Sequence, residues 1–316
     1  MIIVTGGAGF IGSNLLRRLN LDDRDDIIVV DDLTDGRKYR NLLDVSFSDY
    51  LDKDAFRAML EADRNPPAPI DVVYHLGACS DTTEWDGRYM LDTNYEYSKQ
   101  LLHWCAKRQV PLIYASSAAV YGGGRVFAEQ EDNERPLNVY GYSKLLFDRY
   151  VREQLPHLSS QVVGLRYFNV YGPREAHKGR MASVAWHFRN QLERDGVLKL
   201  FGASHGYADG EHRRDFIYVD DACAVTSWFA EQPGVSGIFN CGTGSSRSFN
   251  DMAQTLTASA GGGSIEYLPF PDDLRTAYQA YTEADLSQLR RAGYSAPFTP
   301  LEQGVAAYLS WLQSSE

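Results

Sequence analysis

The sequence predicts an α/β protein with a doubly wound parallel sheet and a smaller C-terminal α/β domain. Three observations support this prediction. Residues 1–5 form a short run of apolar and β-branched side chains, which is typical of a buried strand. A glycine-rich turn and a helical pattern follow, and then a second apolar run at residues 27–30. Strands and helical patterns alternate through the first half of the chain, as they do in Rossmann-type folds.

The glycines of the first turn are spaced for contact with a dinucleotide. Gly6, Gly9 and Gly12 stand three residues apart. This spacing suits a tight turn, close approach of the backbone to a pyrophosphate and close packing of the next helix. Apolar side chains in residues 11–19 recur at helical spacing, so amides at the start of that helix would face the anion. A strand-turn-helix unit without a ligand is the alternative.

The acids after the second apolar run bear on which dinucleotide binds. Asp31 and Asp32 follow the glycines by about 20 residues, where a dinucleotide site needs an acid for the adenosine ribose. Both would repel a 2′-phosphate and favour NAD, whereas Lys38 would pair with that phosphate and favour NADP. The turn at residues 37–38 is explained equally well as a solvated charge pair. The residues alone therefore leave NAD and NADP open.

The remaining elements follow in chain order. A proline-rich loop at residues 64–69 leads into a third strand and turn at residues 71–78. A helix is expected over residues 94–105 and a strand over residues 111–117. We expect residues 1–170 to form the dinucleotide-binding domain. The later patterns predict a strand and turn at residues 238–244, a glycine connector at 261–263, a helix over 301–312 and a mainly substrate-binding domain over 171–316, with some chain returning to the first domain.

Composition limits the class of protein. With 316 residues, 44% hydrophobic and 12% aromatic, the chain can bury a large core. No window holds eighteen uninterrupted apolar residues and no basic leader precedes the first strand, so we expect a cytoplasmic protein that contacts no membrane. Four scattered cysteines without a C-x-x-C pair argue against a metal site or disulfide framework. The net charge of −11 argues against nucleic acid as a partner.

A serine, a tyrosine and a lysine are placed for chemistry at a carbinol. Ser117 ends a predicted strand, and Tyr140 and Lys144 lie one helical turn apart on the same face. A phenol with a pKa of about 10 is a poor base, but a nearby ammonium would lower that pKa toward the working range. Ser117 would hydrogen-bond the same substrate hydroxyl. In isolation, such a pair is usually a packing residue beside a solvated lysine, so the preceding dinucleotide unit is what favours catalysis.

Residues 6–12, residues 117–122 and the pair Tyr140 and Lys144 resemble the extended short-chain dehydrogenase/reductase class. This class includes nucleotide-sugar epimerases and dehydratases. Its dehydratases carry an acid pair directly after the serine, where this chain has Ala118 and Ala119, so dehydration is disfavoured. The resemblance also implies that Asn169 touches the sugar nucleotide and that Arg214 binds its diphosphate; a guanidinium suits phosphate oxygens.

Within this class, residues 75–80, 82–87, 136–144, 172–179 and 278–282 resemble the ADP-L-glycero-D-manno-heptose 6-epimerase family. The resemblance implies inversion of the sixth carbon of ADP-D-glycero-D-manno-heptose through a ketone, to supply heptose for the lipopolysaccharide inner core. It implies bound NADP, with NAD as the alternative, and a homo-oligomer, often a pentamer. The family usually has Glu where Leu76 stands and Asn where Asp32 and Thr93 stand, and these departures fall on expected cofactor contacts.

The resemblance also implies roles for individual residues. Tyr140, assisted by Lys144 and with Ser117 orienting the oxygen, would take the hydroxyl proton, and Lys178 would be a second acid/base with a depressed pKa. Cofactor contacts are expected from Gly6, Gly9, Phe10, Ile11, Gly12, Asp31, Asp32, Lys38, Lys53, Leu76, Gly77, Ala78, Cys79, Ser80, Thr93, Asn94, Lys144, Val170 and Lys178. Substrate contacts are expected from Ser117, Asn169, Arg180, His187, Phe201, Gly202, Ala203, Ser204, Arg214 and Tyr278.

Two other functions fit parts of the sequence. A UDP-hexose 4-epimerase would use the same tyrosine chemistry on a ring carbon, but the motif around Lys178 speaks against it. A catalytically silent NADP-sensing module would bind the cofactor without turnover. The intact set of Ser117, Tyr140 and Lys144 argues against that reading.

Overall fold

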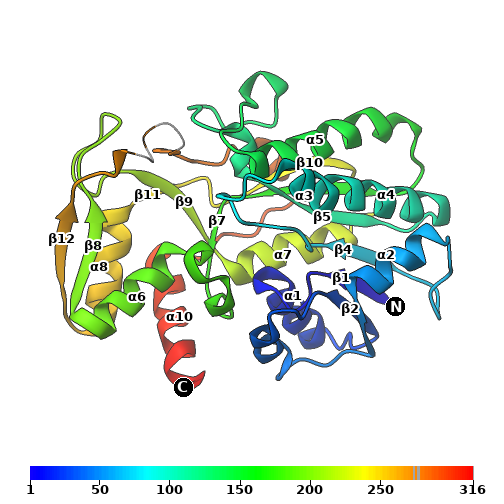
Figure 1. The fold of residues 1–316 in the computed structure, drawn as a ribbon, viewed down its shortest axis with the longest axis horizontal. Coiled ribbons are helices and arrows are strands. Elements are labelled where there is room, and N and C mark those ends of the chain that lie inside the picture. Colours follow the sequence, from blue (N-terminus) through cyan, green and yellow to red (C-terminus); the bar gives the residue numbers. More distant parts are fainter. Residues whose placement is uncertain (273–274, 276–277, 316) are drawn as a thin grey trace.

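The computed structural model describes residues 1–272, 275 and 278–315. Its centre is a seven-stranded parallel sheet in the order β10-β6-β5-β4-β1-β2-β3 (Figure 1). The prediction of a doubly wound parallel sheet is therefore confirmed. The strands of this sheet are β1 (Ile2–Thr5), β2 (Ile27–Asp31), β3 (Asp49–Asp52), β4 (Val72–His75), β5 (Leu112–Ser117), β6 (Val162–Tyr167) and β10 (Gly237–Cys241).

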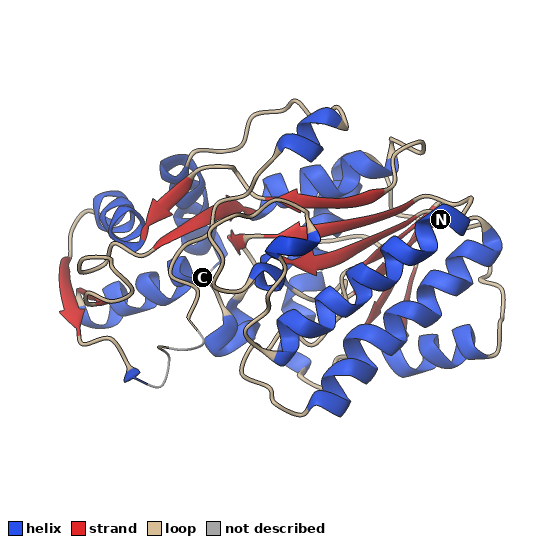
Figure 2. Cartoon of the chain, turned by 90° about the horizontal axis from the view of Figure 1, so that it is seen from above, coloured by secondary structure: helices blue, strands red, loops and turns tan. Residues whose placement is uncertain are grey.

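Successive side chains of each strand face opposite layers of helices. Ile2 and Val4 join the core beneath α1 and α7, whereas Ile3 joins the core beneath α2, α4 and α5. Both faces are covered, which explains why these strands are continuous apolar runs rather than alternating ones. Figure 2 shows the strands side by side with the helices packed beside them. The helices of the two layers are α1 (Phe10–Leu21), α7 (Val219–Ala230), α9 (Ser287–Arg291), α2 (Lys53–Glu61), α3 (Gly87–Leu91), α4 (Tyr97–Arg108) and α5 (Val139–Gln154).

A second, smaller α/β region lies beside the large sheet, on the left of Figure 1. It contains a three-stranded sheet, β11-β9-β7, and a parallel pair, β12-β8. Phe188, Met252 and Tyr308 belong to the separate apolar core that holds its helices to these strands. Its elements are β7 (Asn169–Tyr171), α6 (Val184–Asp195), β8 (Val197–Phe201), β9 (Arg213–Tyr218), β11 (Ser246–Ser248), α8 (Phe249–Ala260), β12 (Ser264–Leu268) and α10 (Leu301–Ser315).

Short helical turns complete the chain. The helix expected over residues 94–105 begins instead as a π-helical turn, η2 (Asp92–Glu96), and continues as α4. The π turn coincides with a side-chain bond from Asn94 to the backbone of Cys79, a local demand that apolar spacing does not reveal. The 3₁₀ turns are η1 (Gly36–Leu42), η3 (Ala118–Tyr121), η4 (Glu131–Asn133), η5 (Leu155–His157) and η6 (Ala176–Met181).

Chain from the second half returns to the large sheet, because β10 is one of its strands and α7 packs against it. The division into domains at residue 170 stays a prediction.

All four cysteines are free thiols. Among the described helices, none is long and apolar enough to cross a membrane.

Candidate active site

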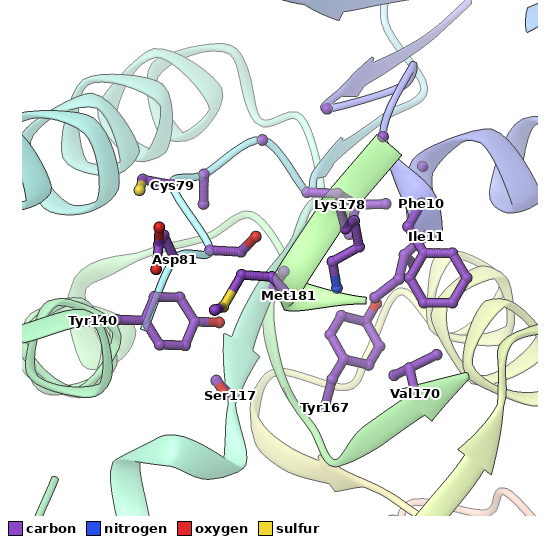
Figure 3. A pocket seen from close by; sticks show the side chains of 18 of the residues that line it. Phe10, Ile11, Cys79, Asp81, Ser117, Tyr140, Tyr167, Val170, Lys178 and Met181 are labelled. Carbon is purple, nitrogen blue, oxygen red and sulfur yellow. The ribbon is translucent and has the colours of Figure 1, made fainter. Parts of the chain in front are cut away.

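A cavity of about 740 Å³ opens at the carboxyl end of the large sheet. Thr5, Asp31, Ser117 and Tyr167, the last residues of β1, β2, β5 and β6, contribute to its wall. The glycine-rich turn lines one part and helix α5 another, and the loop that contains η6 also lines it (Figure 3). Parallel sheets of this kind bind ligands at this edge, so the cavity is the candidate active site.

The glycine-rich turn is as tight as its spacing predicts. Gly6 has a positive φ of 70°, and its carbonyl accepts a hydrogen bond of 3.0 Å from the amide of Gly9. A Cβ on Gly12 would lie 2.0 Å from that carbonyl oxygen, so only glycine fits there. No side chain caps the start of α1, which leaves its first amides to an anion. These residues fit the pyrophosphate of a dinucleotide.

Two aspartates and two lysines form ion pairs at the end of β2. Asp31 accepts a 2.5 Å bond from the Lys38 ammonium and a 2.7 Å bond from the amide of Ala8 in the glycine-rich turn. Asp32 accepts a 2.5 Å bond from the Lys53 ammonium. This bond is the main cause that lowers the pKa of Asp32. Each acid is therefore matched by a cation, and the repulsion expected from the aspartates is largely offset.

Three predicted catalytic side chains meet in the cavity. In Figure 3 the hydroxyl of Tyr140 points inward, Ser117 lies beside it and the ammonium of Lys178 enters from the opposite wall. Lys178 lies in η6, where Gly179 has a positive φ of 54° that bends the turn. Its ammonium lies 5.3 Å from the ring centroid of Phe10. A substrate carbon held between these walls would have a proton carrier on each side.

The pKa of Tyr140 is raised, not lowered as predicted, and Lys144 is not among the causes of the shift. Burial raises the pKa of Tyr140, and a hydrogen bond with Ser117 only partly opposes that shift. Burial also lowers the pKa of Lys144 to about 8. The Lys144 ammonium donates a 2.9 Å bond to the carbonyl of Ala115. One helical turn places the two residues on a common face, but the neighbouring strand decides where the ammonium goes.

The pKa of Lys178 is depressed, as predicted. Burial lowers it, whereas nearby Glu175 acts in the opposite direction. Glu175 is fully buried and accepts a 2.7 Å bond from the Ser183 hydroxyl as well as bonds from the amides of Ser183 and Gly172. The carboxylate thus ties together the two ends of the loop that carries Lys178.

Nearly all of the predicted cofactor residues line the cavity. Asn94 is the exception, since its side chain is buried against the backbone of Cys79 and the hydroxyl of Ser143. It shapes the loop at Cys79 rather than the cavity wall. The residues that line the cavity are Gly6, Gly9, Phe10, Ile11, Gly12, Asp31, Asp32, Lys38, Lys53, Leu76, Gly77, Ala78, Cys79, Ser80, Thr93, Lys144, Val170 and Lys178.

The predicted substrate residues divide into two groups. Ser117 and Asn169 line the cavity. Arg214 lies in a buried aromatic cluster, with its guanidinium 5.0 Å from the ring centroid of Tyr278 and 5.4 Å from that of Phe249, and Phe249 also lines the cavity. Arg214 and Tyr278 are not part of the cavity lining, and neither are the six other predicted substrate residues. These six are Phe201, whose ring contacts Tyr278; Gly202, Ala203 and Ser204 in the following loop; Arg180, which donates to Asp81; and His187, which contacts the Arg180 carbonyl.

Some cavity residues were missed by the sequence analysis. Thr82 and His177 lie inside motifs that carried the family resemblance, and Asp81 and Met181 lie directly beside those motifs. Phe249 had no local signal, because a single aromatic at the start of a helix is usually a packing residue. Among the described residues, no group of three or more His, Cys, Asp or Glu side chains is placed to hold a metal ion.

The dinucleotide turn and the inward-facing tyrosine are typical of nicotinamide-dependent enzymes. Residues 2–242 match the model of the NAD dependent epimerase/dehydratase family, and the chain belongs to that family. An ADP-L-glycero-D-manno-heptose-6-epimerase of Alkalilimnicola ehrlichii is 60% identical over 309 residues, which cover 98% of this chain and 96% of that protein. The predictions of family and of an epimerase are therefore confirmed.

Solved structures agree with this classification. The ADP-L-glycero-D-manno-heptose-6-epimerase of Helicobacter pylori matches with a TM-score of 0.84 and 30% identity over 99% of this chain and 96% of that chain. A UDP-glucose 4-epimerase of Thermotoga maritima, solved with UDP-glucose, matches with a TM-score of 0.82 and 28% identity over 99% of each chain. The cofactor is a nicotinamide dinucleotide, as the family description states.

Proposed function

We propose that this chain inverts the sixth carbon of ADP-D-glycero-D-manno-heptose to give ADP-L-glycero-D-manno-heptose. The supporting observation is that Tyr140, Ser117 and Lys178 face one cavity in a chain that is 60% identical to an ADP-heptose epimerase. A carbinol carbon cannot invert by proton loss, because its C–H bond is not acidic. Oxidation to a ketone makes the centre planar, and reduction from the other face inverts it. When bound, the nicotinamide supplies this reversible hydride transfer.

The side chains of this chain manage the protons. Burial raises the pKa of Tyr140 and lowers that of Lys178, so it disfavours the phenolate on one wall and the ammonium on the other. Ser117 holds the reacting oxygen, because its hydroxyl lies beside that of Tyr140. The oxygen of each epimer faces a different wall. Tyr140 then serves the hydroxyl of one epimer and Lys178 serves that of the other.

We further propose that the dinucleotide is NADP rather than NAD. Lys38 and Lys53 line the ribose end of the cavity, and each forms an ion pair with an aspartate. The two pairs leave no excess negative charge there, and the Lys53 ammonium, whose pair with Asp32 is partly exposed, can turn to a 2′-phosphate. Assembly into a homo-oligomer and a cytoplasmic location stay predictions.

Proton NMR of the heptose tests the proposed function. Incubation with ADP-D-glycero-D-manno-heptose should convert it to the L-glycero isomer. Tyr140→Phe should lower kcat by about a hundredfold or more, since it removes a proton carrier. Tyr142→Phe is the matched control, because Tyr142 is 45% exposed on the same helix and should retain activity. Absence of conversion, or inversion of UDP-glucose alone, would refute the proposal.

A further inference from the structure

A buried carboxylate lies one helical turn beyond Lys144. Asp148 of α5 is completely buried and accepts three hydrogen bonds of 2.9 Å: from the hydroxyls of Tyr114 and Ser116 and from Nε of Arg166. Arg166 is also fully buried and reaches Glu134, which in turn binds Arg152. A network of buried charges rarely stabilises a protein more than apolar packing would. We therefore ask which groups this network holds in place.

The position of this carboxylate relates it to the candidate active site. Tyr114 and Ser116 point toward α5 from strand β5, and the carbonyl of Ala115 between them accepts a hydrogen bond from the Lys144 ammonium. Lys144 and Asp148 together hold three consecutive strand residues, 114–116. The next residue in that strand is Ser117, and the same helix carries Tyr140. We call this arrangement, residues 114–116 with Lys144 and Asp148, the α5–β5 clamp.

The neighbouring strand leaves space for the clamp. Gly164 of β6 pairs in register with Tyr114, and a Cβ on Gly164 would lie 2.4 Å from the Tyr114 hydroxyl oxygen. Any larger residue at this position would push that hydroxyl away from Asp148. Arg166, two residues further along β6, pairs in register with Ser116. Two adjacent strands and a helix therefore converge on one carboxylate.

We propose that Asp148 is a positioning residue for the reaction: through the α5–β5 clamp it sets the distance and orientation between Ser117 on the strand and Tyr140 on the helix. This inference rests on the proposed function of those two residues. Asp148 touches neither substrate nor cofactor, since it does not line the cavity. It acts through Ser116, which precedes Ser117, and through the helix that carries Tyr140.

Steady-state kinetics of Asp148→Asn test the clamp. Asparagine keeps the shape but presents an amide N–H₂ to a site where only donors point inward. We expect kcat to fall by about a hundredfold from misplacement of reacting groups, with KM for the ADP-heptose and the content of bound dinucleotide unchanged. Turnover by the unaltered chain tests the proposed function by itself, and the ratio of the two kcat values tests only the clamp.

Val151→Ala is the control for simple destabilisation. Val151 is fully buried on the same helix, outside the clamp, and its truncation should lower the melting temperature while leaving kcat unchanged. If Asp148→Asn does not fold, Ser116→Ala removes a single donor and should lower kcat by about tenfold. The inference is overturned if Asp148→Asn folds and keeps full kcat. If Asp148→Asn does not fold, full kcat in Ser116→Ala overturns it instead. The inference is also overturned if Val151→Ala, compared at the same melting temperature, loses as much kcat as the clamp variant.

Discussion

At the ribose end of the cavity, two ion pairs bear on the proposed preference for NADP. Lys53 is 41% exposed and Asp32 32% exposed, so their pair is held loosely enough to exchange partners. Asp31 is less free, because it also holds the amide of Ala8 in the glycine-rich turn. The selectivity for a 2′-phosphate should therefore depend more on Lys53 and Asp32 than on Asp31.

Replacement of Lys53 tests this selectivity. Lys53→Gln removes a cation and leaves Asp32 to repel a 2′-phosphate, so NADP affinity should fall by about tenfold while NAD affinity changes little. Calorimetric titration of cofactor-free protein with each dinucleotide measures both constants. Lys107→Gln is the control, because Lys107 of α4 forms a similar exposed ion pair with Asp63 and neither residue lines the cavity. Equal losses for NADP and NAD would contradict the assignment.

A site residue could be predicted from the sequence where its position is set by neighbours in the chain, and not where it is set by a distant element. Tyr140, Ser117 and Lys178 lie in compact motifs, so their presence at the cavity followed from the sequence. The direction of the Lys144 side chain could not be predicted, because the Ala115 carbonyl that accepts its hydrogen bond belongs to another element. Phe249 was missed for the same reason: it reaches the cavity only through the packing of α8 on the smaller sheets.

At the scale of elements, a histidine joins two strands and a helix. His75 at the end of β4 bonds the Thr5 hydroxyl of β1 at 2.7 Å and the Ser98 hydroxyl of α4 at 2.9 Å. Burial lowers its pKa from 6.5 to about 3. The folded state therefore prefers the neutral ring, and the unfolded state binds more protons at mildly acid pH.

The pH dependence of unfolding tests this link. Because the folded pKa lies below the unfolded one, the contribution of His75 to stability is complete above pH 6.5 and is lost as the pH falls toward 3. His75→Asn should flatten the slope of the unfolding free energy against pH between these values, whatever its effect at neutral pH. Denaturant titrations at several pH values measure that slope. An unchanged slope would show that the ring already binds a proton in the folded state.

The same scale shows which elements a sequence reveals. Strands β1, β2 and β5 were predicted because burial on both faces makes them continuous apolar runs. Strands β3 and β12 were not, since they are short and mostly exposed and therefore lack an apolar pattern. Strand β10 was predicted, but only the fold shows that it closes the far edge of the large sheet beside β6.

At the scale of the whole molecule, the large sheet and the smaller α/β region have separate tasks. The carboxyl ends of the sheet strands present the dinucleotide turn and Ser117, helix α5 presents Tyr140, and the loop with Lys178 connects β7 and α6 of the smaller region. A substrate in the cavity is thus enclosed by side chains from both regions. This enclosure favours a reaction in which hydrogen removed from the carbinol is kept and returned without exchange with water.

The fate of the hydrogen on the sixth carbon tests the account most directly. ADP-D-glycero-D-manno-heptose labelled with deuterium at that carbon should be converted in ordinary water to the L-glycero isomer with the label retained, as followed by mass spectrometry and proton NMR. Retention follows if the same bound cofactor takes and returns the hydride. Inversion with loss of the deuterium to water would contradict the account, because it would require removal of the hydrogen as a proton.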